Sequence, residues 1–142
     1  MPLYHPWRAT PEHVVIKFVD HLPNGTRGQT HGDCIEINRR VLSSAERRCT
    51  LAHELVHHER GGLVPIEPIL EHREERLVER TAARRLIALD QLIDVLKWTR
   101  HAPEVADELW VDVPMLMAFV ETLTEREHAA IRVALADLDE VA

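Results

Sequence analysis

The residues best suited to chemistry lie in the stretch HELVH, residues 53–57. On a helix, side chains four positions apart point the same way, so His53 and His57 could hold one metal ion together. Glu54 would lie about 60° round the helix from His57, near enough to reach a water beside the ion without binding the ion. Two imidazoles with a neighbouring carboxylate suit zinc-assisted hydrolysis, in which Glu54 takes a proton from the attacking water.

The chain holds ten histidines, so chance could produce this motif and its surroundings must decide. Ser43 and Glu46 form a capping box, in which a hydroxyl and a carboxylate each satisfy a free backbone N–H. The helix that they open should run to about Arg60 and stop at Gly61-Gly62. Apolar residues surround the motif on this helix: Leu51, Ala52, Leu55 and Val56. The motif therefore falls inside a well-defined helix, which favours a real metal site.

A zinc ion held by two histidines and a catalytic water needs one more protein ligand. The next expected helix, residues 69–89, offers two glutamates. At about 100° per residue, Val78 and Leu86 lie within about 60° of Glu75, which places Glu75 on the apolar, inward-facing stripe. An ionised carboxylate there needs a cation nearby, so Glu75 is the preferred third ligand and Glu79 the other candidate. The alternative is that both glutamates pair with arginines elsewhere in the fold.

Two further residues beside the motif have plain interpretations. His58 follows the second expected ligand and could stabilise an oxyanion, although simple exposure is the plainer reading. Cys49 lies one helical turn before His53 and could approach the metal, but a small buried thiol in the core is favoured.

The elements that must position these residues can be read from the pattern. His13–Val19 is rich in β-branched residues and predicts a strand, and alternation over residues 34–38 predicts a second. Residues 22–28 hold Pro23 and Asn24-Gly25 and predict a turn. After the motif helix, the stretch LVPIEP (63–68) predicts a loop. Further helices are expected over residues 69–89, 90–100, 103–110 and 115–123, and from the Thr124–Glu127 cap onward.

The chain as a whole therefore predicts one α+β domain over residues 1–142, mostly helical with a small N-terminal sheet, since its length suits a single domain. Its 45% hydrophobic and 29% charged residues are ordinary for a soluble protein. No apolar run approaches the roughly 18 residues of a membrane helix, and the N-terminus has no apolar signal-peptide core. Two cysteines indicate no disulfide framework. We expect a cytoplasmic protein without membrane contacts, of undetermined oligomeric state.

Three stretches, residues 47–62, 73–87 and 105–123, together resemble the ImmA/IrrE-type HExxH metallopeptidases of phages, mobile elements and bacteria, in particular the small actinobacterial and actinophage forms. The resemblance covers about residues 30–125. It implies a zincin-like domain in which His53, His57 and Glu75 bind zinc and Glu54 is the base. Glu79 stands where the family expects an Asn or Asp that supports a ligand histidine. Ala88 stands where the family usually has proline.

The resemblance also implies a biological target. Members of the family cleave helix-turn-helix repressors and so induce phage, mobile-element or stress genes, which implies a zinc endopeptidase with a repressor protein as substrate. The alternative is a non-catalytic regulatory module, with a structural metal or none, that acts on a repressor by contact.

The C-terminal third, about residues 103–142, forms an acidic subregion. It holds two basic residues against ten acidic ones, a net charge of −8, which disfavours nucleic-acid binding. Residues 105–123 have the rhythm of a helix-turn-helix, but Trp110 stands where the turn usually has glycine. The second helix, residues 115–122, has no Arg, Lys, Asn or Gln to read bases. We expect these helices to pack on the catalytic core and help shape a substrate groove, although a DNA-binding regulator remains a rival.

Overall fold

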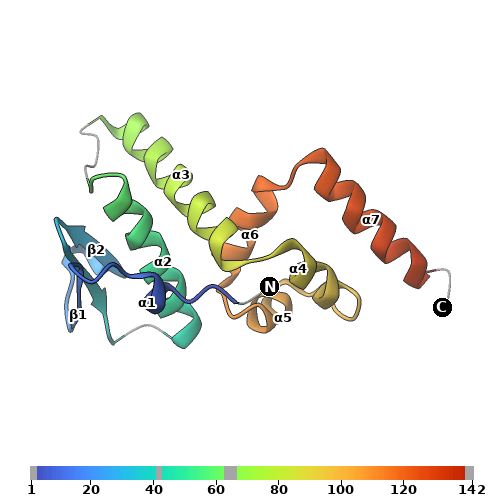
Figure 1. Cartoon of the computed structure of the whole chain (residues 1–142), viewed down its shortest axis with the longest axis horizontal. Coiled ribbons are helices and arrows are strands. Elements are labelled where there is room, and N and C mark those ends of the chain that lie inside the picture. The colour runs from blue at the N-terminus through green and yellow to red at the C-terminus, as the bar shows by residue number, and fades with distance from the viewer. Residues whose placement is uncertain (1–2, 41–42, 63–66, 140–142) are drawn as a thin grey trace.

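Figure 1 shows the fold, taken from a computed structural model that describes residues 3–40, 43–62 and 67–139. In chain order the elements are α1 (Pro6–Ala9), β1 (Val15–Val19), the short 3-10 turn η1 (Pro23–Gly25), β2 (Gly28–His31), β3 (Cys34–Asn38), α2 (Ser44–Glu59), α3 (Pro68–Leu86), α4 (Leu89–Leu96), α5 (Ala102–Glu108), α6 (Val113–Thr122) and α7 (Glu125–Asp139). A small N-terminal sheet beside a mostly helical body confirms the predicted α+β, zincin-like class.

The sheet has the strand order β1-β3-β2, with β1 parallel and β2 antiparallel to β3. The predicted strands β1 and β3 are confirmed, and Ile35 and Ile37 are fully buried as the alternation requires. Strand β2 was not predicted, because GQTH lacks the run of β-branched or aromatic residues that signals a strand. It forms through its pairing with β3 and is an edge strand of this sheet.

Helix α2 lies between the sheet and α3 (Figure 1). Its predicted ends are confirmed. Ser43 Oγ accepts a hydrogen bond from Glu46 N at 3.2 Å. The helix stops at Gly61 and Gly62, which take φ of +94° and +66°, and Gly62 N donates to His57 O at 2.8 Å. On the sheet side Leu51 and Leu55 belong to the same buried cluster as Val14, Ile35 and Ile37.

Helix α3 begins and ends earlier than expected. Pro68, predicted to lie in a loop, is the first residue of the helix, where its fixed φ and missing N–H do no harm. Residues 63–66 of that predicted loop lie outside the described residues. The helix stops at Leu86 because Ile87 and Ala88 are extended, with φ of −121° and −98°. Ile87 is buried, so the break keeps an apolar side chain in the core and lets the chain turn into α4.

The C-terminal helices pack on the core largely as predicted. Helix α6 lies against α3 and buries Met115, Leu116, Ala118 and Phe119. Helix α7 begins with the predicted cap, in which Thr124 N donates to Glu127 Oε1 and Glu127 N donates to Thr124 Oγ1, both at 3.1 Å. It then extends to the far end of the molecule and touches α4 (Figure 1). Within the described ranges, no helix is long and apolar enough to cross a membrane.

The turn between α5 and α6 forms although Trp110 stands where such a turn usually has glycine. Trp110 takes φ of +57°, so the left-handed conformation that usually needs glycine forms without one. Arg48, which is completely buried, helps to hold this turn: its Nη1 donates to Trp110 O at 3.0 Å, and its guanidinium lies 5.2 Å from the Trp110 ring. Trp110 Nε1 also donates to Ser44 Oγ at 3.1 Å. Tertiary contacts therefore stabilise a backbone conformation that the residue type alone disfavours.

Candidate metal centre

Three of the predicted site residues converge between α2 and α3. His53 Nε2 lies 3.0 Å from Glu75 Oε2, and His57 Nε2 lies 2.8 Å from Glu75 Oε1. One ligand atom from each residue lies within 4.8 Å of the other two. Two imidazole nitrogens and a carboxylate oxygen are a donor set that zinc takes in catalytic sites, so these residues fit a metal ion. The structure brings them together, and their role as ligands stays a prediction.

The depth of Glu75 differs from the expectation. Its direction round the helix is as predicted, but its side chain is 44% exposed, whereas Val78, one turn on, is fully buried. The physical reason is that the first turns of α3 project beyond the core, as exposed Ile69 and Leu70 show. His53 and His57 are more enclosed, with side chains 16% and 9% exposed. The site is therefore walled on the α2 side and open to solvent beside Glu75.

Glu79 faces the Nδ1 atom of the His53 ring, whereas Glu75 faces its Nε2 atom. Glu79 Oε2 is 3.1 Å from His53 Nδ1, at an angle that leaves this nitrogen without a well-formed hydrogen bond. Glu75 and Glu79 thus both face His53, and within the described residues neither forms one of the arginine ion pairs that were the alternative. The contact puts Glu79 where a residue that supports a ligand histidine would lie, and leaves the position of metal ligand to Glu75.

The electrostatics of this cluster favour a cation. Burial lowers the pKa of His53, but the hydrogen bond with Glu75 and the close contact with the Glu79 carboxylate outweigh it and raise the pKa to about 10. Hydrogen bonds from His53 and then His57 hold the pKa of Glu75 well below its usual range. The raised pKa of His53 reports a negative potential around this imidazole, and the lowered pKa of Glu75 shows that its carboxylate is stabilised as an anion; a divalent ion would suit both.

Strand β2 fixes the expected base, Glu54, which is 6% exposed. Thr30 Oγ1 donates to Glu54 Oε2 at 2.6 Å and lies 3.2 Å from the Glu54 carbonyl oxygen. Gly28 allows β2 to approach this closely, because a Cβ there would stand 2.7 Å from Thr50 Cγ2 and 3.1 Å from Glu54 Cγ. Sequence reasoning missed both residues because it missed β2, and the single glycine was the only signal.

Two cavities are bounded by both Gly28 of β2 and Glu54. The first, of about 250 Å³, is also bounded by His53, Glu79 and residues that lead into or begin α6: Asp112, Pro114 and Met115. Arg27 Nη1 donates to Asp112 Oδ2 at 2.9 Å beside it. The second, also of about 250 Å³, is bounded by Glu54, His57, Glu75 and the whole of β2. The C-terminal subregion thus contributes to the wall of the first cavity.

The other neighbours of the motif do not join the cluster. Cys49 is buried in the core, and burial raises the pKa of its thiol to about 12, so it stays protonated and packs as a small apolar group. His58 is neither exposed nor aimed at the site: its side chain is 15% exposed and its Nε2 lies 2.9 Å from Asp33 Oδ1.

Comparison with known proteins gives one informative match. A peptidase family model described as the IrrE N-terminal-like domain matches residues 13–108. This confirms the resemblance seen in the sequence, with bounds shifted toward the N-terminus. The match runs from just before β1 to the end of α5, so it includes His53, Glu54, His57, Glu75 and Glu79 and excludes α6 and α7. No curated protein and no solved structure matches the chain.

Proposed function

The chain belongs to the IrrE N-terminal-like family of metallopeptidases, and from that premise we propose that it is a zinc-dependent endopeptidase of the HExxH type. The observation that carries the proposal is the convergence of His53, His57 and Glu75 on one point, beside a buried Glu54. Unlike Glu79, which faces a ligand histidine, Glu54 is held by Thr30, so support of a structural metal does not account for its position. The arrangement therefore favours catalysis over a structural role.

Zinc is the ion we propose, because two imidazoles, one carboxylate and open positions on the solvent side are what catalytic zinc sites use. His53, His57 and Glu75 would hold it. When bound, zinc would polarise the scissile carbonyl and make water a better nucleophile.

Glu54 is the proposed base and, later in the reaction, the proposed acid. Thr30 occupies its Oε2, so we assign to Oε1 the task of taking the proton from water and passing it to the leaving amine. The hydrogen bond also fixes the direction of the carboxylate, which matters because proton transfer requires hydrogen-bond reach. Glu79 would orient the His53 ring through Nδ1. Thr30 and Glu79 are thus positioning residues.

An extended peptide is the substrate form that suits the surroundings of Glu54. Strand β2 is an edge of the sheet; the second cavity is bounded by its whole length, and the first meets it at Gly28. A peptide could add to this edge through main-chain hydrogen bonds, with alternate side chains entering the two cavities. Such binding would place a backbone carbonyl at the metal site without requiring one particular residue.

The biological target that we propose is a helix-turn-helix repressor of phage, mobile-element or stress genes, and this rests on the family resemblance. Labelling of new N-termini after incubation of the zinc-loaded chain with candidate repressors would test it. A cut that depends on Glu54 supports the proposal, and intact repressors together with cuts in unrelated proteins would contradict it.

The comparison of Glu54→Gln with Glu59→Gln separates catalysis from binding. Both changes neutralise a carboxylate on α2. Glu59, however, is the exposed last residue of the helix and pairs with Arg85. We expect Glu54→Gln to bind zinc normally and to lose cleavage, while Glu59→Gln keeps both. The rival, a regulatory module that acts by contact, predicts that Glu54→Gln still relieves repression in cells. That result would overturn the enzymatic proposal.

A further inference from the structure

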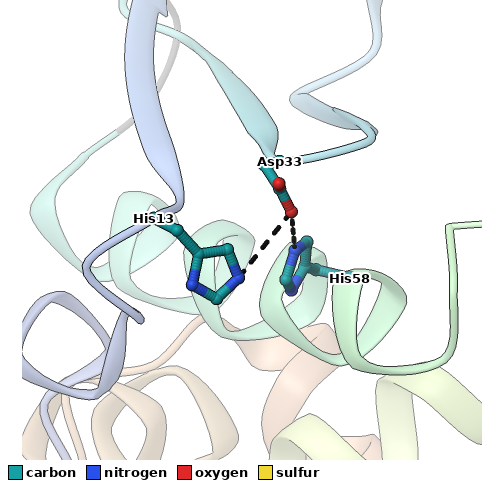
Figure 2. A group of neighbouring side chains, drawn as sticks. All are labelled: His13, Asp33 and His58. Carbon is teal, nitrogen blue, oxygen red and sulfur yellow. Dashed lines mark hydrogen bonds and ion pairs between the residues drawn. The ribbon is translucent and has the colours of Figure 1, made fainter.

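A second group of metal-binding side chains lies outside the cluster of His53, His57 and Glu75. Figure 2 shows the group: Asp33 points between the rings of His13 and His58. Asp33 Oδ1 is 2.9 Å from His58 Nε2 and 3.8 Å from His13 Nε2. One ligand atom from each of the three residues lies within 4.8 Å of the others.

Three segments that are distant in sequence supply these residues. His13 lies just before β1, Asp33 in the turn between β2 and β3, and His58 near the end of α2. The backbone fixes the first two, because Val15 N donates to Asp33 O at 2.8 Å and Val14 N donates to Pro11 O at 3.0 Å. His13 and Asp33 therefore lie on segments that backbone hydrogen bonds hold in place.

Buried contacts hold the third segment against the other two. Val14, directly after His13, is 7% exposed and belongs to the same apolar cluster as Leu51 and Leu55 of α2. This cluster fixes α2 under the sheet and so sets the distance between His58 and Asp33.

The donor set suits a metal better than it suits an ion pair. Surface ion pairs contribute only about 0–1 kcal/mol, so one carboxylate gains little by holding two imidazoles. With bonds of about 2.0–2.1 Å, tetrahedral zinc places its nitrogen and oxygen donors roughly 3.4 Å apart. The two distances to Asp33 Oδ1, 2.9 Å and 3.8 Å, lie on either side of that spacing, so small side-chain rotations would complete the geometry.

We propose that His13, Asp33 and His58 form a second site for a divalent transition-metal ion of the zinc class. His13 and Asp33 are 64% and 63% exposed, so water or a ligand from another molecule completes the coordination. The site is more open than the first and binds more weakly. Its ion joins the sheet to the last turn of α2, next to His57, and stiffens that turn. This inference does not depend on peptidase activity.

Calorimetric titration of the metal-free chain, residues 1–142, with Zn²⁺ tests the proposal. We expect two binding events in the unchanged protein, and loss of the weaker one in His13→Gln and in Asp33→Asn. Changes to residues that merely support a ligand typically weaken metal binding about 10- to 100-fold, so removal of a ligand should weaken it by at least about tenfold. His21→Gln, which changes an exposed histidine outside both groups, should leave both events in place.

The same titration identifies each site independently. Glu75→Gln should remove the tight event and spare the weak one, and zinc should still raise the Tm of this variant, unless Asp33→Asn is added. A single event in the unchanged protein that Glu75→Gln abolishes would overturn the second site without touching the first. A weak event that persists in His13→Gln and Asp33→Asn, or that His21→Gln abolishes equally, would also overturn it.

Discussion

Gly28→Ala tests the account of how β2 positions Glu54. The added Cβ would stand 2.7 Å from Thr50 Cγ2, 3.1 Å from Glu54 Cγ and 3.3 Å from Glu36 O. Contacts shorter than about 3.0 Å are not tolerated, so β2 must move away from α2 or the Thr50 and Glu54 side chains must shift. Thr50 and Glu54 are 7% and 6% exposed, and the Glu54 carboxylate is bound to Thr30 of β2, so a shift of β2 or of the Glu54 side chain moves the base. The change reaches the base without altering any expected metal ligand.

The expected magnitudes follow from this crowding. Overpacking of a filled interior typically costs about 1–3 kcal/mol, so the free energy of unfolding should fall by that amount. Displacement of a catalytic group by about 1 Å costs roughly 100-fold in rate, so kcat/KM should fall by about that factor. Zinc affinity should stay unchanged, because His53, His57 and Glu75 are not among the atoms that the new methyl group meets.

The assay combines kinetics on a cleavable peptide, urea unfolding and zinc titration. Thr50→Ser supplies the matched control, because it removes the Cγ2 methyl group at 2.7 Å while the hydroxyl stays. The double variant Gly28→Ala/Thr50→Ser should recover part of both stability and kcat/KM. Full activity in Gly28→Ala, or no recovery in the double variant, would refute the reasoning that β2 sets the position of Glu54.

Three further predictions follow from other contacts. Thr30→Val removes the hydroxyl bound to Glu54, so kcat/KM should fall about tenfold or more at unchanged zinc content, and Thr30→Ser should restore most of it in the same kinetic assay. Arg48→Met removes a buried donor to the carbonyls of Tyr4, Leu86, Leu109 and Trp110, so the free energy of unfolding in urea should drop by about 2–4 kcal/mol, and an unchanged midpoint would contradict this role. Cys49, with a pKa of about 12, should resist alkylation at pH 8 until the chain unfolds, whereas partly exposed Cys34 should react; peptide mass spectrometry would show the order.

The sequence specified α2 and its motif well because local rules act there together. The Ser43 cap, the apolar spacing and the terminal glycines each favour the same helix, and the structure begins and ends it within one residue of the expectation. The direction of Glu75 also follows from helical periodicity alone. Its half-exposed depth does not, since that depends on how far α3 projects past the core.

Features that depend on contacts between distant segments could not be predicted. Strand β2 has little strand character of its own and forms by pairing with β3, so Thr30 and Gly28 went unseen. Trp110 takes a left-handed conformation because buried Arg48 and Ser44 bind it, and no local rule foresees that. His13 and Asp33 meet His58 only once the sheet has packed on α2. Each case requires the tertiary structure before the local consequence can be read.

Zinc content after loading and desalting tests the central claim most directly. The measurement is best made in the His13→Gln background, which removes the second proposed site, with Glu75→Ala and Glu79→Ala added separately. Because two histidines and one carboxylate form a zinc ligand set, we predict about one zinc per chain in the background protein. It should be lost in Glu75→Ala and retained in Glu79→Ala, with weaker affinity. No zinc in the background protein, or zinc that survives Glu75→Ala, would contradict the proposed centre.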